Sequence, residues 1–290
     1  MLSFKGKKLS REVTLKSLFN IDGFGLEIGA SHNPLLPKAK GFNVKTVDYA
    51  SKTELFEKYS NIPGVDAHRI EEVDFVTNGK PLLEIIPNRN QFDFIIASHV
   101  IEHVPNLIEF IQSSAELLKD DGLLVLAVPD KRYCFDLIQP LSTTGSVLQA
   151  NFEKRQRPSP GLIFDSIAYD VLREGQAGWE EDNKNEPTFN STLEAAKNFF
   201  EFSSQSDNYV DVHVWRFVPS SFRLIIEDLF SLGSIPVREK QFVESASGEF
   251  YVTLSKQGEG PKFSRIDLAM RSMKEQSAPF ETKNSQGRRE

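Results

Sequence analysis

The 290-residue chain has little of what several classes of protein require. Its single cysteine, Cys134, excludes an intrachain disulfide and a cysteine-based zinc cluster. No uninterrupted apolar run reaches about 18 residues, the length that a transmembrane helix needs. The basic N-terminal stretch lacks the apolar region and cleavage site of a secretory signal. A net charge of −7 argues against an extended phosphate-binding surface. We therefore expect a cytoplasmic protein that binds neither membranes nor nucleic acids.

Short apolar runs alternate with helix-like segments as far as residue 130. Near-continuous apolar runs are typical of parallel strands that helices cover on both faces. Their alternation with helices predicts an α/β fold, Rossmann-like and doubly wound, around a mostly parallel sheet. The expected strands are residues 24–29, 44–48, 92–98 and 122–130, with 69–76 as a weaker candidate, and the expected helices are 51–59 and 105–119.

The alternation stops after Asp130. Residues 140–210 are polar and rich in turn-forming residues, and only STLEAAKNFFEF looks helical, so we interpret them as an inserted cap. A helix at 219–233, N-capped by Ser220, then precedes a C-terminal antiparallel hairpin made by strands at 235–244 and 248–256. We divide the chain into a cofactor-binding core (1–139), a cap over the acceptor site (140–210), the C-terminal part of the core sheet (211–256) and a largely disordered tail (257–290) in which 266–274 favour a short helix.

Polar residues follow the first two predicted strands. In open α/β sheets, ligands bind beyond the carboxyl ends of the strands, near the point where the strand order reverses. There Glu27 is costly to bury unless something polar binds it, and Gly29 permits a tight turn that the small Ala30 and Ser31 keep open to a ligand. Asp48 ends the second strand, where a carboxylate can accept hydrogen bonds from both ribose hydroxyls. The alternative is that both acids cap helices or pair with lysines.

The glycine pattern that holds a dinucleotide is missing. An NAD site needs G-x-G-x-x-G, whereas here Gly25 precedes Glu27 and only Gly29 follows it. With no second glycine or helix start placed to hold a pyrophosphate, a dinucleotide is disfavoured. A nucleoside without phosphates, such as S-adenosylmethionine, fits better.

The motifs LEIGASHNP, VDYA, VDFV, FDFIIASHVIEHVPNLIEF and LLKDDGLLVLAVPD resemble, in this order, those of class I S-adenosylmethionine-dependent methyltransferases. The resemblance covers residues 24–130 and resumes at HVWRFVPSSFRLIIEDLFSLG, although Ser31 and Asn33 replace later glycines of the family's first motif. It implies that the methionine portion is held by Glu27, Gly29, Ala30 and Ser31, the ribose by Asp48, the adenine by Tyr49, Asp74 and Phe75, and the sulfonium end by Ser98 and His99.

The segment H-V-I-E-H matches the H-x-x-E-H arrangement of one class of zinc peptidases through His99, Glu102 and His103. Such a site requires both histidines on one helix, whereas His99 directly follows a predicted strand and Pro105 is typical of the first turn of the next helix. No third ligand stands at a zinc-like spacing. Related methyltransferases also commonly carry E-H-V-P here. We therefore expect no metal and interpret Glu102 and His103 as residues that orient the loop.

Methyl transfer to an amine or a hydroxyl requires a group that takes the acceptor's proton. His213 is the candidate general base, with Asp211 available to orient it, and the alternative is a histidine that only packs. Asp130, Arg132 and Tyr133 follow the fifth predicted strand and are candidates for acting on a polar acceptor. The alternative for these three is an ordinary salt-bridged strand exit.

The combination of IIASHVIEHVPNLIEF, VPDKRYCFD and DVHVWRFVPSSFRL is similar to a group of bacterial methyltransferases found alone or fused to glycosyltransferases. This resemblance implies a small polar or glycan-type acceptor and an association with a glycosyltransferase. Two alternatives stay open. The substituted glycine motif favours a non-catalytic cofactor-binding or scaffold module, and a nicotinamide oxidoreductase is disfavoured by the missing phosphate-binding glycines.

Overall fold

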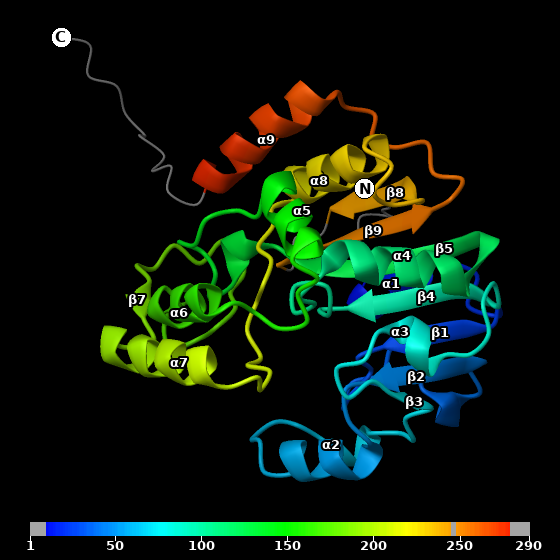
Figure 1. Cartoon of the computed structure of the whole chain (residues 1–290), viewed down its shortest axis with the longest axis horizontal. Helices are drawn as coiled ribbons and strands as arrows, with labels where there is room; N and C mark the ends of the chain where they lie inside the picture. Colours follow the sequence, from blue (N-terminus) through cyan, green and yellow to red (C-terminus); the bar gives the residue numbers. More distant parts are fainter. Residues whose placement is uncertain (1–9, 245–247, 279–290) are drawn as a thin grey trace.

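A computed structural model describes residues 10–244 and 248–278. One sheet contains seven strands (Figure 1): β1 (Gly25–Ile28), β2 (Val44–Asp48), β3 (Phe75–Val76), β4 (Phe92–Ser98), β5 (Leu118–Pro129), β8 (Arg238–Glu244) and β9 (Glu249–Ser255). Their order is β3-β2-β1-β4-β5-β9-β8. Strands β1 to β5 pair in parallel, whereas β9 pairs antiparallel with both β5 and β8. The predicted mostly parallel sheet with a C-terminal antiparallel hairpin is thus confirmed.

Helices lie before, between and after these strands. The α-helices are α1 (Arg11–Lys16), α2 (Lys52–Tyr59), α3 (Leu82–Ile85), α4 (Leu107–Leu117), α5 (Thr144–Phe152), α6 (Pro160–Ala168), α7 (Leu193–Gln205), α8 (Pro219–Ser231) and α9 (Arg265–Ser277). Short 3-10 turns are η1 (Lys38–Lys40), η2 (Ala67–Arg69) and η3 (Lys131–Tyr133), and β6 (Val171–Leu172) pairs with β7 (Thr188–Phe189). Among the described residues, no helix is both long and apolar enough to cross a membrane.

Successive residues of β4 face two different apolar cores. Ile95 packs into the core that also contains residues of α4, α5 and α8, whereas Phe94 and Ile96 pack into the core on the other face, where Leu15 of α1 lies. Each side chain points to the opposite face from its neighbour because strand residues alternate. Burial on both faces explains why the parallel strands are apolar almost without interruption.

The strand order reverses at β1, which lies between β2 and β4. Residues 29–43, which connect β1 to β2, contain only the 3-10 turn η1 and no α-helix. The sequence predicts the absence of a helix start after the first strand, and this prediction is confirmed. The carboxyl edge of the sheet beside β1 is therefore lined by a loop and not by the start of a helix.

The predicted cap has more regular structure than its polar sequence indicates. Helices α6 and α7 and the β6–β7 pair lie together beyond the end toward which the arrow of β4 points (Figure 1). Helix α5 behaves differently because its Val147 and Ala150 are fully buried in the main core against α4 and α8. With only these two buried residues, α5 gives too weak an apolar pattern for the sequence to show it.

Two predictions for the C-terminal part are wrong. Helix α8 begins after Val218 with Pro219 in its first turn, so Ser220 is not the N-cap, because proline is well suited to the first helical position. The tail is also ordered as far as residue 278, although the short helix expected at 266–274 is confirmed there as α9. Helix α9 packs on α8, and Glu275 accepts hydrogen bonds from the Ser220 N–H (2.8 Å) and hydroxyl (2.6 Å). The remainder of the predicted disordered tail, 279–290, lies outside the described residues.

Candidate functional site

The loops that follow β1 and β4 touch each other at the carboxyl edge of the sheet. The two strands are parallel neighbours, with Ile28 opposite Ala97. Gly29 has φ +72°, and a Cβ added there would lie 2.7 Å from Cγ2 of Val100. Real Cβ atoms essentially never come that close to another heavy atom. Only glycine at position 29 therefore lets the loop after β1 (residues 29–34, the first loop) contact the loop after β4 (residues 99–106, the fourth loop).

Glu27 anchors the chain just after the first loop. Its carboxylate is buried and accepts hydrogen bonds from the backbone N–H groups of Leu35 (2.7 Å) and Leu36 (3.0 Å). Burial raises the pKa of this carboxyl, although the two N–H donors act in the opposite direction. The polar partners that the sequence demands for Glu27 thus include the protein's own backbone, and direct contact with a methionine portion stays a prediction.

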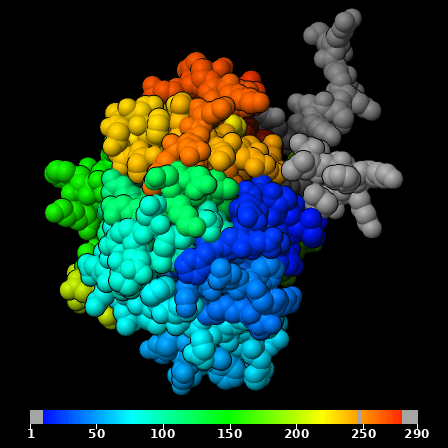
Figure 2. Space-filling model, turned by 90° about the vertical axis from the view of Figure 1, so that its right-hand side faces the viewer, coloured from blue at the N-terminus to red at the C-terminus, as the bar shows by residue number. Residues whose placement is uncertain are grey.

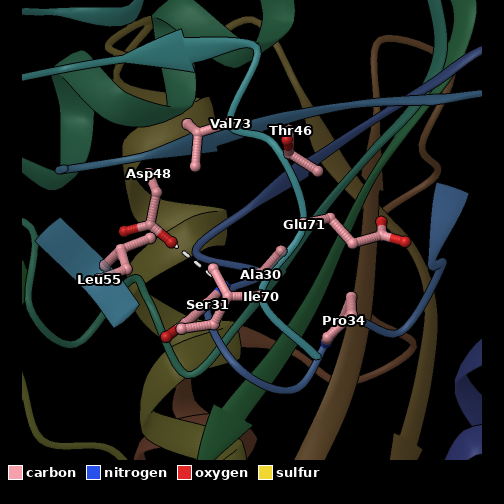
Figure 3. Close-up of a pocket in the computed structure, with 9 residues that line it drawn as sticks. All are labelled: Ala30, Ser31, Pro34, Thr46, Asp48, Leu55, Ile70, Glu71 and Val73. Carbon is pink, nitrogen blue, oxygen red and sulfur yellow. Dashed lines mark hydrogen bonds between the residues drawn. The ribbon is translucent and has the colours of Figure 1, made fainter. Parts of the chain in front are cut away.

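Asp48 lies at the end of β2 and faces the first loop (Figure 3). Its Oδ2 accepts a hydrogen bond from the Ser31 N–H (3.1 Å), and its Oδ1 accepts one from the Tyr49 N–H (2.8 Å). A carboxylate has about four acceptor positions, so roughly two remain for the hydroxyls of a ligand. Burial raises the pKa of Asp48, and the two N–H donors oppose that change. Besides Gly29, Ser31 of this loop has a left-handed backbone, with φ +44°.

A small pocket lies beside this carboxylate, between the first loop, the second strand and residues 70–73, which precede the third strand (Figure 3). The lining side chains are Ala30, Ser31, Pro34, Thr46, Asp48, Leu55, Ile70, Glu71 and Val73. None of them comes from the loop after β4. The pocket thus borders the ribose side of the predicted site and not its sulfonium side.

The structure does not bring Asp74 to the carboxyl edge. The third strand begins only at Phe75, so Asp74 lies at the level of Thr46, and its carboxylate pairs with Lys38 (2.7 Å) and Lys45 (2.8 Å). The residues that do follow β3 are Thr77, whose N–H donates to the Asp48 carbonyl (2.9 Å), and Asn78, whose N–H donates to the Tyr49 carbonyl (3.3 Å). Neither residue was predicted, because the family resemblance assigns the adenine contact to Asp74 and Phe75 instead.

Tyr49 and Phe75 have different surroundings. Tyr49 follows β2, is 48% exposed, and has the ammonium group of Lys58 4.8 Å from its ring centroid. It is therefore free to present its ring to a planar ligand. Phe75 is half-buried and packs against the main core. Its contact with adenine stays a prediction.

Ser98 and His99 are fastened to distant parts of the chain. Ser98 Oγ accepts a hydrogen bond from Arg11 Nη2 (2.6 Å), and His99 Nε2 lies 2.8 Å from Glu249 Oε2. Glu249 on β9 also pairs with Arg11 (2.6 Å). In Figure 2 the blue N-terminal residues accordingly lie beside the orange C-terminal part. His99 has φ +53°, which turns the chain sharply out of β4.

The chain returns from the cap over the loop that follows β4. Within residues 209–217, the N–H groups of Val214 (2.6 Å) and Trp215 (3.1 Å) donate to the Glu102 carbonyl, and the Trp215 indole donates to the Val104 carbonyl (2.7 Å). Tyr209 donates its hydroxyl hydrogen to the His103 carbonyl (2.8 Å). These bonds bring His213 to the fourth loop, as its candidate role requires.

His213 has a different carboxylate partner from the predicted one. Its Nδ1 lies 2.5 Å from Asp136 Oδ2, whereas Asp211 lies 2.9 Å from Nδ1 of His103. The pairing with Asp211 is therefore wrong for His213. Burial would raise the pKa of Asp136, but the hydrogen bonds from His213 and Arg216 outweigh burial and lower it. Asp136 is thus an ionised, buried partner that the sequence did not reveal, because 77 residues separate it from His213.

Glu102, His103 and His213 form one cluster. One ligand-type atom of each lies within 4.8 Å of the others, and the rings of His103 and His213 meet edge to face with centroids 4.8 Å apart. As expected, the H-V-I-E-H segment is not helical, because α4 begins only at Leu107. His213 is the third potential metal ligand of this cluster. It comes from residues 209–217, so the spacing of the H-V-I-E-H segment could not show it.

Asp130 and Arg132 bind each other. Arg132 Nε donates to Asp130 Oδ1 (2.9 Å) and Oδ2 (3.0 Å), and Asp130 caps η3. Burial raises the pKa of Asp130, although Arg132 opposes that change. This geometry matches the salt-bridged strand exit named above as the alternative. Contact of either residue, or of Tyr133, with an acceptor stays a prediction.

Comparisons with known proteins give a family. A model described as a methyltransferase domain matches residues 7–181, more than half of the chain. A Rickettsia bellii protein named ubiquinone biosynthesis O-methyltransferase is 26% identical over 131 residues, which cover 44% of this chain and 51% of the relative. The chain thus spans about half the length of the curated relatives it matches.

Solved structures resemble the chain more distantly. A methyltransferase from Methanosarcina mazei is 15% identical, covers 87% of this chain and 100% of its own, and gives a TM-score of 0.42. A methyltransferase from Aquifex aeolicus is 13% identical. The match covers 84% of this chain and 88% of the other, with a TM-score of 0.41. Likenesses at this level carry no argument about function. The family match, together with the strand order and the Gly29 turn, decides the assignment: the chain belongs to the methyltransferase-domain family, among the class I S-adenosylmethionine-dependent methyltransferases.

Proposed function

We propose that the protein transfers a methyl group from S-adenosylmethionine to a small polar or glycan-type acceptor. The observation that carries this proposal is the contact of Gly29 with Val100. This contact places the first loop, which is hydrogen-bonded to Asp48, next to the fourth loop, which carries Glu102 and His103. A nucleoside-binding edge and a buried polar cluster thus share one end of the sheet, which is the arrangement that transfer from a nucleoside cofactor to an acceptor requires.

The cofactor side fits an adenosyl group. Asp48 would accept hydrogen bonds from the ribose hydroxyls with the acceptor positions that Ser31 and Tyr49 leave free. Tyr49 would lie against the adenine, and the backbone of residues 29–31 would line the methionine portion. Glu27 would act indirectly, by fixing the loop.

On the acceptor side, the chain must align the reactants and deal with a proton. Methyl transfer from a sulfonium is an in-line displacement, so alignment and exclusion of water supply most of the acceleration. His213 is the proposed acceptor-activating residue, and Asp136 is its positioning residue. The cap lies beyond the carboxyl end of β4 (Figure 1), which supports a role in covering the acceptor.

The acceptor itself is supported by two likenesses. The resemblance to methyltransferases associated with glycosyltransferases favours a sugar or glycan, handled in the cytoplasm together with a glycosyltransferase. The name of the Rickettsia relative favours an oxygen as the methylated atom. Both are compatible with a hydroxyl-bearing acceptor, which is where a screen should begin.

Calorimetric titration of cofactor-stripped protein with S-adenosylmethionine, and in parallel with NAD, tests the proposal. We expect one-to-one micromolar binding of S-adenosylmethionine and no saturable binding of NAD. Binding of NAD alone would overturn the proposal in favour of an oxidoreductase. Tight binding of S-adenosylmethionine without turnover on a broad panel of sugars and phenols would instead identify a non-catalytic module.

A further inference from the structure

We propose that Glu102, His103 and His213 bind one divalent first-row transition-metal cation, and that this cation binds the hydroxyl group of the acceptor. The cation site is inferred from the side chains alone. Its role toward an acceptor hydroxyl rests on the proposed methyl transfer.

The first observation is the isolation of the Glu102 carboxylate. Its side chain is fully buried, and neither of its oxygens has a hydrogen-bond partner among residues 10–244 and 248–278. A buried carboxylate without partners is among the most costly arrangements in a protein. Two imidazole nitrogens lie near Oε1: His99 Nδ1 at 3.7 Å and His103 Nε2 at 3.9 Å. These distances are too long for hydrogen bonds but leave room for an ion.

The second observation is that each histidine of the cluster has a carboxylate behind it. Asp136 accepts at His213 Nδ1 (2.5 Å), and Asp211 lies 2.9 Å from His103 Nδ1, although at an angle poor for a hydrogen bond. Histidines that bind metals usually donate the N–H of their other ring nitrogen to a carboxylate, which fixes the tautomer and orients the ring. Here this arrangement leaves Nε2 of both rings as the available ligand atom.

The size and access of the cluster suit a metal ion. Ligand atoms around a tetrahedral zinc ion at 2.0–2.1 Å lie roughly 3.4 Å apart, so separations of up to 4.8 Å require the three side chains to draw together by roughly 1 Å. Glu102 and His213 are buried, but the His103 side chain is 32% exposed and gives access from solvent. Two imidazoles and one carboxylate leave coordination positions for an outside oxygen.

The donor set decides the class of ion and its chemistry. Imidazole nitrogen with carboxylate oxygen suits Zn²⁺, Mn²⁺ or Fe²⁺ better than Mg²⁺ or Ca²⁺. A hydroxyl bound to such an ion loses its proton to water near neutral pH more readily than a free hydroxyl does. The resulting oxygen anion attacks the sulfonium methyl carbon, the new O–C bond forms as the C–S bond breaks, and the sulfur keeps the electron pair as S-adenosylhomocysteine. An amine acceptor would need no such ion, so the site favours a hydroxyl acceptor.

Titration of chelator-treated protein with MnCl₂ and with ZnCl₂, followed by calorimetry and thermal unfolding, tests the site. We expect one strong equivalent, and a rise of roughly 5 °C in the unfolding midpoint at about a hundred-fold excess over Kd. Glu102→Gln and His103→Gln should each weaken binding at least ten-fold and abolish the thermal shift. His68→Gln, which alters an exposed histidine outside the cluster, should leave both unchanged. Because His103 is partly exposed, its variant keeps the test valid even if Glu102→Gln fails to fold.

The same preparations separate this inference from the proposed function. Absence of stoichiometric binding of either ion at millimolar concentration overturns the cation site, and so does equal binding by wild type and both cluster variants. Normal binding of S-adenosylmethionine beside such a result would leave the methyltransferase proposal standing. Cation binding without any binding of S-adenosylmethionine would overturn the proposed function and the role toward an acceptor, but not the site.

Discussion

Asp136 Oδ2 lies 2.5 Å from Nδ1 of His213, and the same carboxylate accepts a hydrogen bond from Arg216 Nε (3.2 Å). All three side chains are buried. One carboxylate thus positions a ring of the candidate site and neutralises a buried guanidinium.

Removal of this carboxylate should cost much stability. Asp136→Ala leaves Arg216 buried without its ion pair, so we expect a loss of about 3–5 kcal/mol in the free energy of unfolding. Asp211→Ala is the matched control, because Asp211 pairs with His103 but its side chain is 61% exposed, and it should cost less than about 1 kcal/mol. Urea denaturation measures both. Equal losses would show that burial of Asp136 is unimportant.

Replacement of His213 should affect turnover and not cofactor binding. His213→Ala removes the acceptor-activating group, and we expect turnover to fall by about 10²–10⁴-fold, while the calorimetric Kd for S-adenosylmethionine stays within about two-fold. Asp136→Asn should lower turnover less, since the imidazole of His213 remains and only its carboxylate partner changes. If His213→Ala loses stability but not turnover at a temperature where it is folded, the histidine only packs.

Gly29→Ala should destabilise the protein more than Gly41→Ala does. Gly29 (φ +72°) and Gly41 (φ +87°) both have left-handed backbones, so alanine costs about 1–2 kcal/mol at either position. Only at Gly29 does the new Cβ meet a neighbour, Val100, at 2.7 Å, whereas Gly41 has nothing within 4 Å. The excess loss in Gly29→Ala, measured by urea denaturation, should shrink in Gly29→Ala/Val100→Ala. Equal losses for the two single variants would contradict the close contact.

Asp48→Ala should weaken binding of S-adenosylmethionine by about 1–3 kcal/mol, because hydrogen bonds to a charged group are lost. Asp48→Asn keeps the size and one acceptor oxygen, so its affinity should lie between those of wild type and the alanine variant. Asp74→Asn should have no effect on affinity, since Asp74 does not reach the carboxyl edge. Unchanged affinity in Asp48→Ala would remove the ribose assignment.

Asp74 should contribute stability that acid removes. Burial would raise the pKa of Asp74, but hydrogen bonds from Lys38, Lys45 and the Thr46 N–H outweigh burial and lower it to about 2. Because the pKa in the unfolded chain is about 3.9, the contribution is fully present above that value and is lost as the pH falls through about 2. The stability advantage of wild type over Asp74→Asn should therefore shrink between pH 4 and pH 2. Asp22→Asn, at an exposed aspartate that forms no ion pair within the described residues, should show no such pH dependence.

The sequence predicted the central strands well because their burial on both faces leaves a strong signal. Val44–Asp48 and Phe92–Ser98 were predicted to the residue, and Asp48 and Gly29 lie where the strand-end rule puts them. Weak apolar patterns concealed other elements. Helix α9 buries only Leu268 and Ser272, so the sequence predicted its existence at 266–274 but not that the chain around it is ordered.

Two errors at the site have physical causes. The third strand has only two residues, and an expectation of eight moved Asp74 to the wrong end of it. The pairing of His213 with Asp136 depends on how the return segment crosses the loop after β4, which local sequence does not encode. Residues that meet through long-range packing leave no periodic signal in the chain.

The hydrogen bond between His99 and Glu249 also has a consequence for folding during synthesis on the ribosome. The two residues are 150 positions apart, so a ribosome that adds roughly 5–20 residues per second needs about 8–30 s to produce the second after the first. During that interval β1, β2 and β4 can already pair, because their partners have been synthesised. The nucleoside half of the site can therefore assemble on the nascent chain, whereas the loop after β4 obtains its final anchor only when the last strand joins the sheet.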